Sequence, residues 1–103
     1  MYRNQQIKNA VKIILHKSKM KVRYIGPNQG SDTFTNNKVY PVLGVKVPWI
    51  KIIDDSNEDY TYLINEPRLL DSKVSGNFKI VKDDENGTLK KAFDEVEKWI
   101  NQK

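Results

Sequence analysis

Apolar and polar side chains alternate over residues 39–64, and most of the apolar ones are β-branched or aromatic. This pattern is typical of short strands that bury one face. Pro48 and the polar run 54–58 interrupt it, so the pattern predicts three strands joined by two tight turns. We expect one face of the first strand to carry Val39, Leu43, Val45 and Val47. Consecutive short strands of this kind usually curl into a small barrel or sandwich.

Two further strands flank this region. Residues 20–25 alternate cleanly and predict a half-buried strand, and residues 78–81 predict a short last strand. Between the first two strands, residues 26–38 form a polar loop whose single large apolar residue, Phe34, we expect to pin the loop to the body.

Amphipathic helices are predicted at both ends of the chain. Residues 2–18 and 88–101 carry apolar positions at helical spacing, with Thr88 as the expected N-cap of the second helix. The predicted order is helix, five strands, helix, in a single domain over residues 1–103. Both helices have an apolar stripe that must be covered, by each other, by an open side of the barrel or by a second copy in a homodimer.

Length and charge narrow the class of protein. The 103 residues suit one domain, and the absence of cysteine excludes disulfides and thiolate metal sites. No secretory signal or membrane-spanning run is evident, so we expect a cytoplasmic protein without a membrane partner. The net charge of +5 is uneven, because residues 1–23 contain seven basic residues and no acidic one. Such a segment can attract nucleic acid or can simply keep a helix face soluble.

Four short motifs carry a resemblance to a known group of proteins. They are MKVRYIG at 20–26, KVYPVL at 38–43, WIKIIDDS at 49–56 and EDYTY at 58–62. This run resembles uncharacterised small SH3-like barrel proteins of low-GC Gram-positive bacteria and their mobile elements. The resemblance implies a five-stranded SH3-like small β-barrel over residues 20–81. Together with the helices that periodicity predicts, this gives an α+β fold in which the barrel is flanked by an N-terminal and a C-terminal amphipathic helix. The resemblance implies no activity, and the two helices and Pro48 depart from its pattern.

Catalytic chemistry finds little support in the residues. His16 is the only histidine and lies on the polar flank of a predicted helix without an acidic neighbour. The glycines lack the spacing of a phosphate-binding loop. The pairs Asp54-Asp55 and Asp83-Asp84 lie at a strand end and in a link, where adjacent acids do not converge on a substrate. We therefore expect no enzyme, no catalytic residue and no cofactor.

The spacing of the acidic and amide residues after β-branched residues 52–53 partly matches one metal-binding motif, the calcium loop. Asp55, Asn57, Asp59 and Glu66 occupy its positions 1, 3, 5 and 12, but Tyr60 stands where the loop requires glycine. Residues 60–64 also alternate as a strand, which separates the first ligand from the last. An acidic hairpin turn is the better interpretation, and no metal site is expected.

Two sets of residues are candidates for binding. The aromatic set, which could bind a peptide, stack nucleotide bases or simply form core, consists of Tyr40, Trp49, Tyr60 and Tyr62. The basic set, which could contact phosphates or only solubilise a face, consists of Lys8, Lys12, Lys19, Lys21 and Arg23.

These observations lead to two functional hypotheses. The first is a non-enzymatic module that binds another protein, with a phage- or mobile-element-encoded inhibitor or regulator of a host protein as one version. The alternative is a nucleic-acid-binding accessory protein that uses the basic N-terminal helix and first strand. The scarcity of arginine, three against fifteen lysines, argues against bidentate recognition of bases in the alternative.

Overall fold

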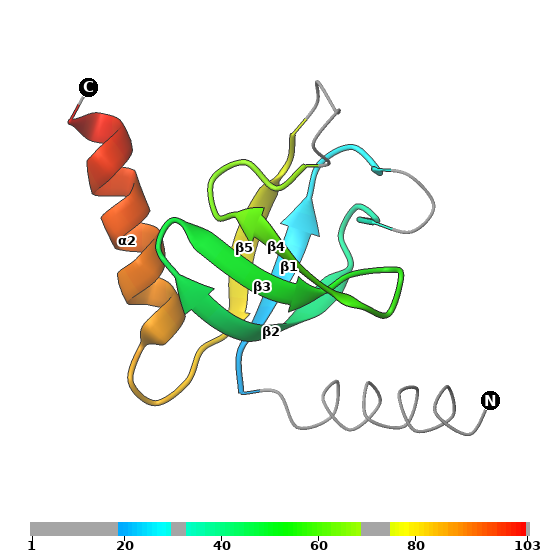
Figure 1. Cartoon of the computed structure of the whole chain (residues 1–103), viewed down its shortest axis with the longest axis horizontal. Coiled ribbons are helices and arrows are strands. Elements are labelled where there is room, and N and C mark those ends of the chain that lie inside the picture. The colour runs from blue at the N-terminus through cyan, green and yellow to red at the C-terminus, as the bar shows by residue number, and fades with distance from the viewer. Residues whose placement is uncertain (1–18, 30–32, 69–74, 103) are drawn as a thin grey trace.

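The chain folds into one five-stranded antiparallel sheet followed by a helix (Figure 1). A computed structural model describes residues 19–29, 33–68 and 75–102. Its elements are β1 (Lys21–Ile25), β2 (Val39–Lys46), β3 (Trp49–Ile53), β4 (Asp59–Leu63), β5 (Asn77–Lys82) and α2 (Thr88–Asn101). The strands lie in the order β4-β3-β2-β1-β5.

The predicted strands and the predicted C-terminal helix are confirmed. Each strand falls within about two residues of its expected bounds, and the acidic run after β3 forms the turn of the β3–β4 hairpin. The predicted helix over 2–18, with its candidates Lys8 and Lys12, lies outside the described residues.

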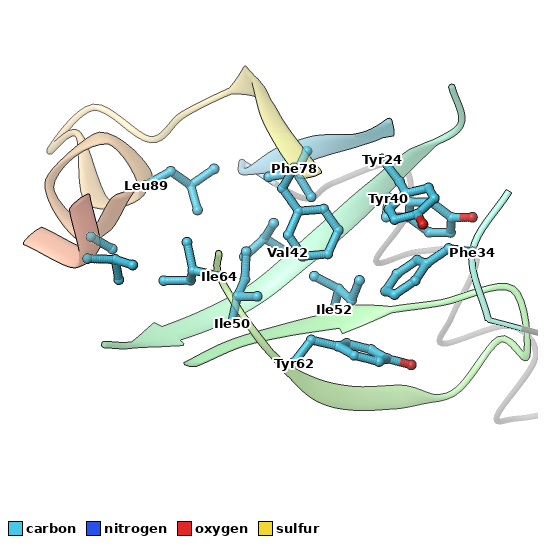
Figure 2. Packing of buried hydrophobic residues seen from close by; sticks show 13 residues of the cluster. Tyr24, Phe34, Tyr40, Val42, Ile50, Ile52, Tyr62, Ile64, Phe78 and Leu89 are labelled. Atoms are coloured by element: carbon cyan, nitrogen blue, oxygen red, sulfur yellow. The ribbon is translucent and has the colours of Figure 1, made fainter. Parts of the chain in front are cut away.

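The prediction of a closed barrel is wrong. In the described part of the chain β4 and β5 lie at opposite edges of the sheet and do not pair with each other. The helix α2 packs against the core instead, through Leu89, Ala92 and Val96. Figure 2 shows Leu89 projecting from α2 toward Ile64 beyond the end of β4. Apolar surface that strand closure would have buried is therefore covered by a helix.

A bulge in β2 explains why the expected face of this strand is incorrect. Val42 pairs with Ile52 and Gly44 with Lys51, so Leu43 is an extra residue between two rungs. An extra residue reverses the alternation of side chains. Val42 is buried before the bulge and Val45 packs against the core after it, whereas Leu43 is 38% exposed.

Aromatic rings fill the end of the core that lies away from α2 (Figure 2). Phe34 is fully buried and its ring centroid lies 4.7 Å from those of both Tyr24 and Tyr62. Phe78 and Tyr40 meet Phe34 edge-on at 5.5 Å. Offset and edge-on contacts of this kind stabilise a core beyond the area that they bury. The prediction that Phe34 holds its loop against the body is confirmed.

Two adjacent carboxylates cap the first turn of α2. Asp84 accepts a hydrogen bond from the backbone N–H of Thr88 at 2.9 Å, and Asp83 accepts from those of Leu89 at 2.9 Å and Lys90 at 3.0 Å. These bonds satisfy amides that have no partner within the helix. The predicted N-cap, Thr88, is the first helical residue and Gly87 occupies the N-cap position. The acidic pair 83–84 therefore has a structural role.

Candidate functional site

Two of the four aromatic candidates belong to the core. Tyr40 and Tyr62 are 1% and 8% exposed. The Tyr62 hydroxyl donates to Asp54 Oδ2 at 2.6 Å, and the Tyr40 hydroxyl donates to Asp55 Oδ1 at 3.0 Å. Each phenol is thus anchored to one of the two adjacent carboxylates in the β3–β4 turn, so its ring is not available to a ligand.

The same contacts set the ionisation of these groups. Burial, assisted by Asp55, raises the pKa of Tyr40 from 10.0 to about 12. Burial and the Asp54 carboxylate likewise raise the pKa of Tyr62. Burial acts to raise the pKa of Asp55, but the hydrogen bonds from Lys38, Thr35 and Tyr40 outweigh it and the pKa is lowered. The turn therefore holds an ionised Asp55 against the neutral phenol of Tyr40.

The other two aromatic candidates lie on the surface. Trp49 is 45% exposed at the start of β3, and Tyr60 is 49% exposed on the edge strand β4, where its hydroxyl donates to Glu58 at 2.9 Å. Both line one shallow hollow together with Leu63 and Arg68. The structure therefore divides the aromatic set into a buried pair and an exposed pair.

The basic candidates on β1 project away from the core. Lys21 and Arg23 alternate with the buried Val22 and Tyr24. Lys19 is exposed immediately before the strand.

Across the β1–β5 pair, cations face cations. Lys21 lies opposite Lys82, and Arg23 lies opposite Lys79. Like charges directly opposite each other in an antiparallel pair destabilise a sheet. We call these four residues, Lys21, Arg23, Lys79 and Lys82, the basic face.

No carboxylate of the described residues relieves this repulsion. Within the part of the chain that the structure describes, Lys21, Arg23, Lys79 and Lys82 form no ion pair. The Arg23 guanidinium instead donates a hydrogen bond from Nη1 to the carbonyl oxygen of Asn37 at 2.6 Å. Within the described residues, the four charges of the basic face are therefore not balanced by a carboxylate.

Sequence reasoning missed Lys79 and Lys82 because their place depends on register. Ile80 lies opposite Val22 and Lys82 opposite Lys21, so Val81 is an extra residue in β5. Without this bulge Lys82 would turn to the other face of the strand. The sequence NFKIVK shows that β5 is basic, but it does not show which cation meets which on β1.

A second surface is a groove between α2 and the chain around Pro48, Ile64 and Phe78. This groove is lined mainly by apolar side chains, among them Pro48, Ile64, Phe93, Val96, Trp99 and Ile100. The charged residues among the described part of its lining are Glu66 and Glu97. Trp99 and Ile100 are about half exposed, so the groove presents apolar surface with an acidic rim.

The described residues also limit the chemistry that can be assigned. Across 19–29, 33–68 and 75–102, no group of three or more histidine, cysteine or acidic residues is placed to hold a metal ion. No described helix is both long and apolar enough to cross a membrane. Comparison of the chain with protein-family models, curated proteins and solved structures finds no match.

Proposed function

We propose that the protein binds nucleic acid through the phosphate backbone, using the basic face of β1 and β5. The observation that carries this proposal is the direct opposition of Lys21 to Lys82 and of Arg23 to Lys79 without a carboxylate among the described residues to balance them. An arrangement that costs stability in the free protein is offset when an anion lies across it.

The spacing of the basic face favours a polyanion over a single small anion. Neighbouring strands lie about 4.8 Å apart, and alternate residues of one strand lie about 6.7 Å apart. The four cations therefore form a two-by-two array that one carboxylate cannot neutralise. A chain of phosphates meets several of them at once, and the release of counterions then drives binding.

The types of side chain also indicate whether the protein would recognise the phosphates or the bases of its ligand. Three of the four cations are lysines, which act as point charges toward phosphate, whereas bidentate recognition of a base favours arginine. We therefore propose binding that depends little on sequence. Lys8, Lys12 and Lys19 precede β1 in the chain, and we propose that they extend the contact with the same backbone.

A charge-reversal experiment with a matched control tests this function. We expect Lys79→Glu combined with Lys82→Glu to weaken binding of a fluorescent random-sequence oligonucleotide by about tenfold or more at low salt. Lys91→Glu combined with Lys98→Glu changes the net charge equally on α2 and is expected to leave the affinity within about twofold. Anisotropy titration measures both. Equal losses in the two variants, or no binding by the unmodified protein at low salt, would contradict the proposal.

A protein partner is a second candidate function, favoured by the groove beside α2. Its apolar lining and its acidic rim, Glu66 and Glu97, suit an amphipathic helix that carries lysine or arginine beside its apolar stripe. A synthetic helical peptide of leucine and lysine is the probe. We expect it to shift the NMR signals of Val96 in the unmodified protein and not in Ile100→Asp. Shifts confined to the basic face would remove this candidate.

A further inference from the structure

We infer that the ligand of the basic face is single-stranded nucleic acid and that Trp49 stacks on one of its unpaired bases. This inference rests on the proposed function and adds the class of nucleic acid and a second point of contact. Its starting point is that Trp49, a large aromatic residue, is 45% exposed on the outer face of the sheet.

Cations surround Trp49 on two sides. Lys46 on β2 lies directly opposite it, and Lys51 follows it on the same face of β3. Lys51 also pairs with the exposed Asp59 at 3.2 Å, whereas Lys46 forms no ion pair within the described residues. An indole beside a lysine offers a base a stacking surface and offers the adjacent phosphate a charge.

The space in front of Trp49 is open. Trp49, Lys46 and Lys51 line a shallow, mostly apolar hollow with Gly44 and Thr61. A Cβ atom built on Gly44 would meet nothing within 4 Å. A planar group can therefore approach over this part of the sheet without displacing protein atoms.

Trp99 shows that exposure alone does not make such a site. It is 46% exposed, almost the same as Trp49, but it lies on α2 among acidic groups. The hollows that Trp99 lines contain four carboxylates, Glu66, Asp94, Glu95 and Glu97, against two lysines, Lys91 and Lys98. Carboxylates repel phosphate, so Trp99 is a natural control for Trp49.

Trp49 and the basic face lie on the outer faces of opposite halves of the folded sheet, because the inner faces of these halves pack against each other through Phe34 (Figure 2). A ligand that touches both must therefore bend around β2, which a flexible single strand can do and a stiff duplex cannot. The strand β2 connects Trp49 with the basic face, because Pro41 lies opposite Lys21 and Lys46 lies opposite Trp49. Five residue steps along β2 separate these two rungs, which is about 17 Å along the strand. A site of this length suits a short single-stranded segment, comparable with the lower range of known single-strand binding modules. A duplex keeps its bases stacked inside the helix and cannot offer one to the indole.

The test compares single-stranded and duplex oligonucleotides of the same sequence. Trp49→Leu keeps apolar volume but removes the aromatic face, and we expect it to weaken single-strand binding about tenfold with little effect on duplex binding. Trp49→Phe keeps a ring and is expected to retain most of the affinity. Trp99→Leu is the matched control and is expected to bind as the unmodified protein does.

Fluorescence provides a readout that leaves Trp49 unchanged. In the Trp99→Phe protein Trp49 is the only tryptophan, and stacking on a base is expected to quench its emission on addition of the single strand. Unquenched emission, or equal affinity of Trp49→Leu and the unmodified protein for the single strand, would overturn the inference. If binding is still lost in Lys79→Glu/Lys82→Glu, the proposed function survives that failure. If the unmodified protein binds neither oligonucleotide, both fail.

Discussion

Lys21 on β1 lies directly opposite Lys82 on β5, and on the same face of the two strands Arg23 lies opposite Lys79. The described residues provide no ion pair for any of the four. A sheet selected only for stability would place an acidic residue on one side of each pair, since opposite charges there are favourable. Stability given up at a surface is a common sign that the surface serves a function.

This relationship predicts that one substitution changes stability and binding in opposite directions. Lys79→Glu replaces a repulsive pair with an attractive one opposite Arg23, so we expect the free energy of unfolding to rise by about 0.5 kcal/mol. The same change is expected to weaken oligonucleotide binding. Urea denaturation and anisotropy on the same samples measure the two effects.

Lys91→Glu on α2 is the control for the change in net charge. It alters the charge of the molecule by the same amount away from the basic face, so we expect little change in either quantity. A Lys79→Glu protein that is less stable than the unmodified protein, with the control unchanged, would show that the opposed cations carry no such cost.

The buried phenol of Tyr62 gives a second prediction. Tyr62→Phe removes the 2.6 Å hydrogen bond to Asp54 and leaves a buried carboxylate with one donor fewer. We expect a loss of about 2 kcal/mol in the free energy of unfolding. Denaturation by urea measures it, with Tyr60→Phe as the control, because the Tyr60 hydroxyl meets an exposed glutamate and its removal should cost under about 0.5 kcal/mol. Equal costs in the two variants would mean that the Tyr62–Asp54 contact is not formed.

Alkaline pH should destabilise the protein in a way that depends on Tyr40. Its pKa is about 12 in the folded chain against 10.0 for an unperturbed tyrosine. Between these two pKa values the unfolded chain has lost the phenolic proton of Tyr40, while the folded chain still keeps it. The contribution of Tyr40 to the free energy of unfolding is therefore fully present below pH 10 and falls as the pH rises toward 12. The full loss is about 2–3 kcal/mol.

Tyr40→Phe isolates this contribution. Urea denaturation at pH 8, 10 and 11 should show a shallower decline in the variant, because the deprotonation of lysines is common to both proteins. The same decline in Tyr40→Phe as in the unmodified protein would contradict the assignment.

The elements of the fold could be predicted from local pattern, but barrel closure could not. Alternation placed five strands, and helical spacing placed α2. Whether β4 pairs with β5 depends on contacts between residues that are distant in the sequence. In this protein the apolar stripe of α2, made of Leu89, Ala92 and Val96, covers the core in place of that pairing. Alternation within one strand does not show whether strand pairing or a helix will cover the core.

The candidate site was predictable only in part, for a related reason. Lys21 and Arg23 could be assigned to an outward face because β1 alternates without interruption. The pairing of Lys79 with Arg23 depends on the register of β5 against β1, and that of Lys82 with Lys21 depends on the bulge at Val81. The positions of Tyr40 and Tyr62 depend on their partners in the β3–β4 turn. Bulges and side-chain hydrogen bonds are set by tertiary contacts, so composition and period do not reveal them.

The salt dependence of binding tests the central claim most directly. If four phosphates are neutralised, the logarithm of the affinity for a single-stranded oligonucleotide should fall with the logarithm of salt concentration at a slope of about −2.8. Lys79→Gln combined with Lys82→Gln removes two of these contacts and should reduce the slope to about −1.4. A slope near zero in the unmodified protein, or the same slope in both proteins, would contradict the role of the basic face.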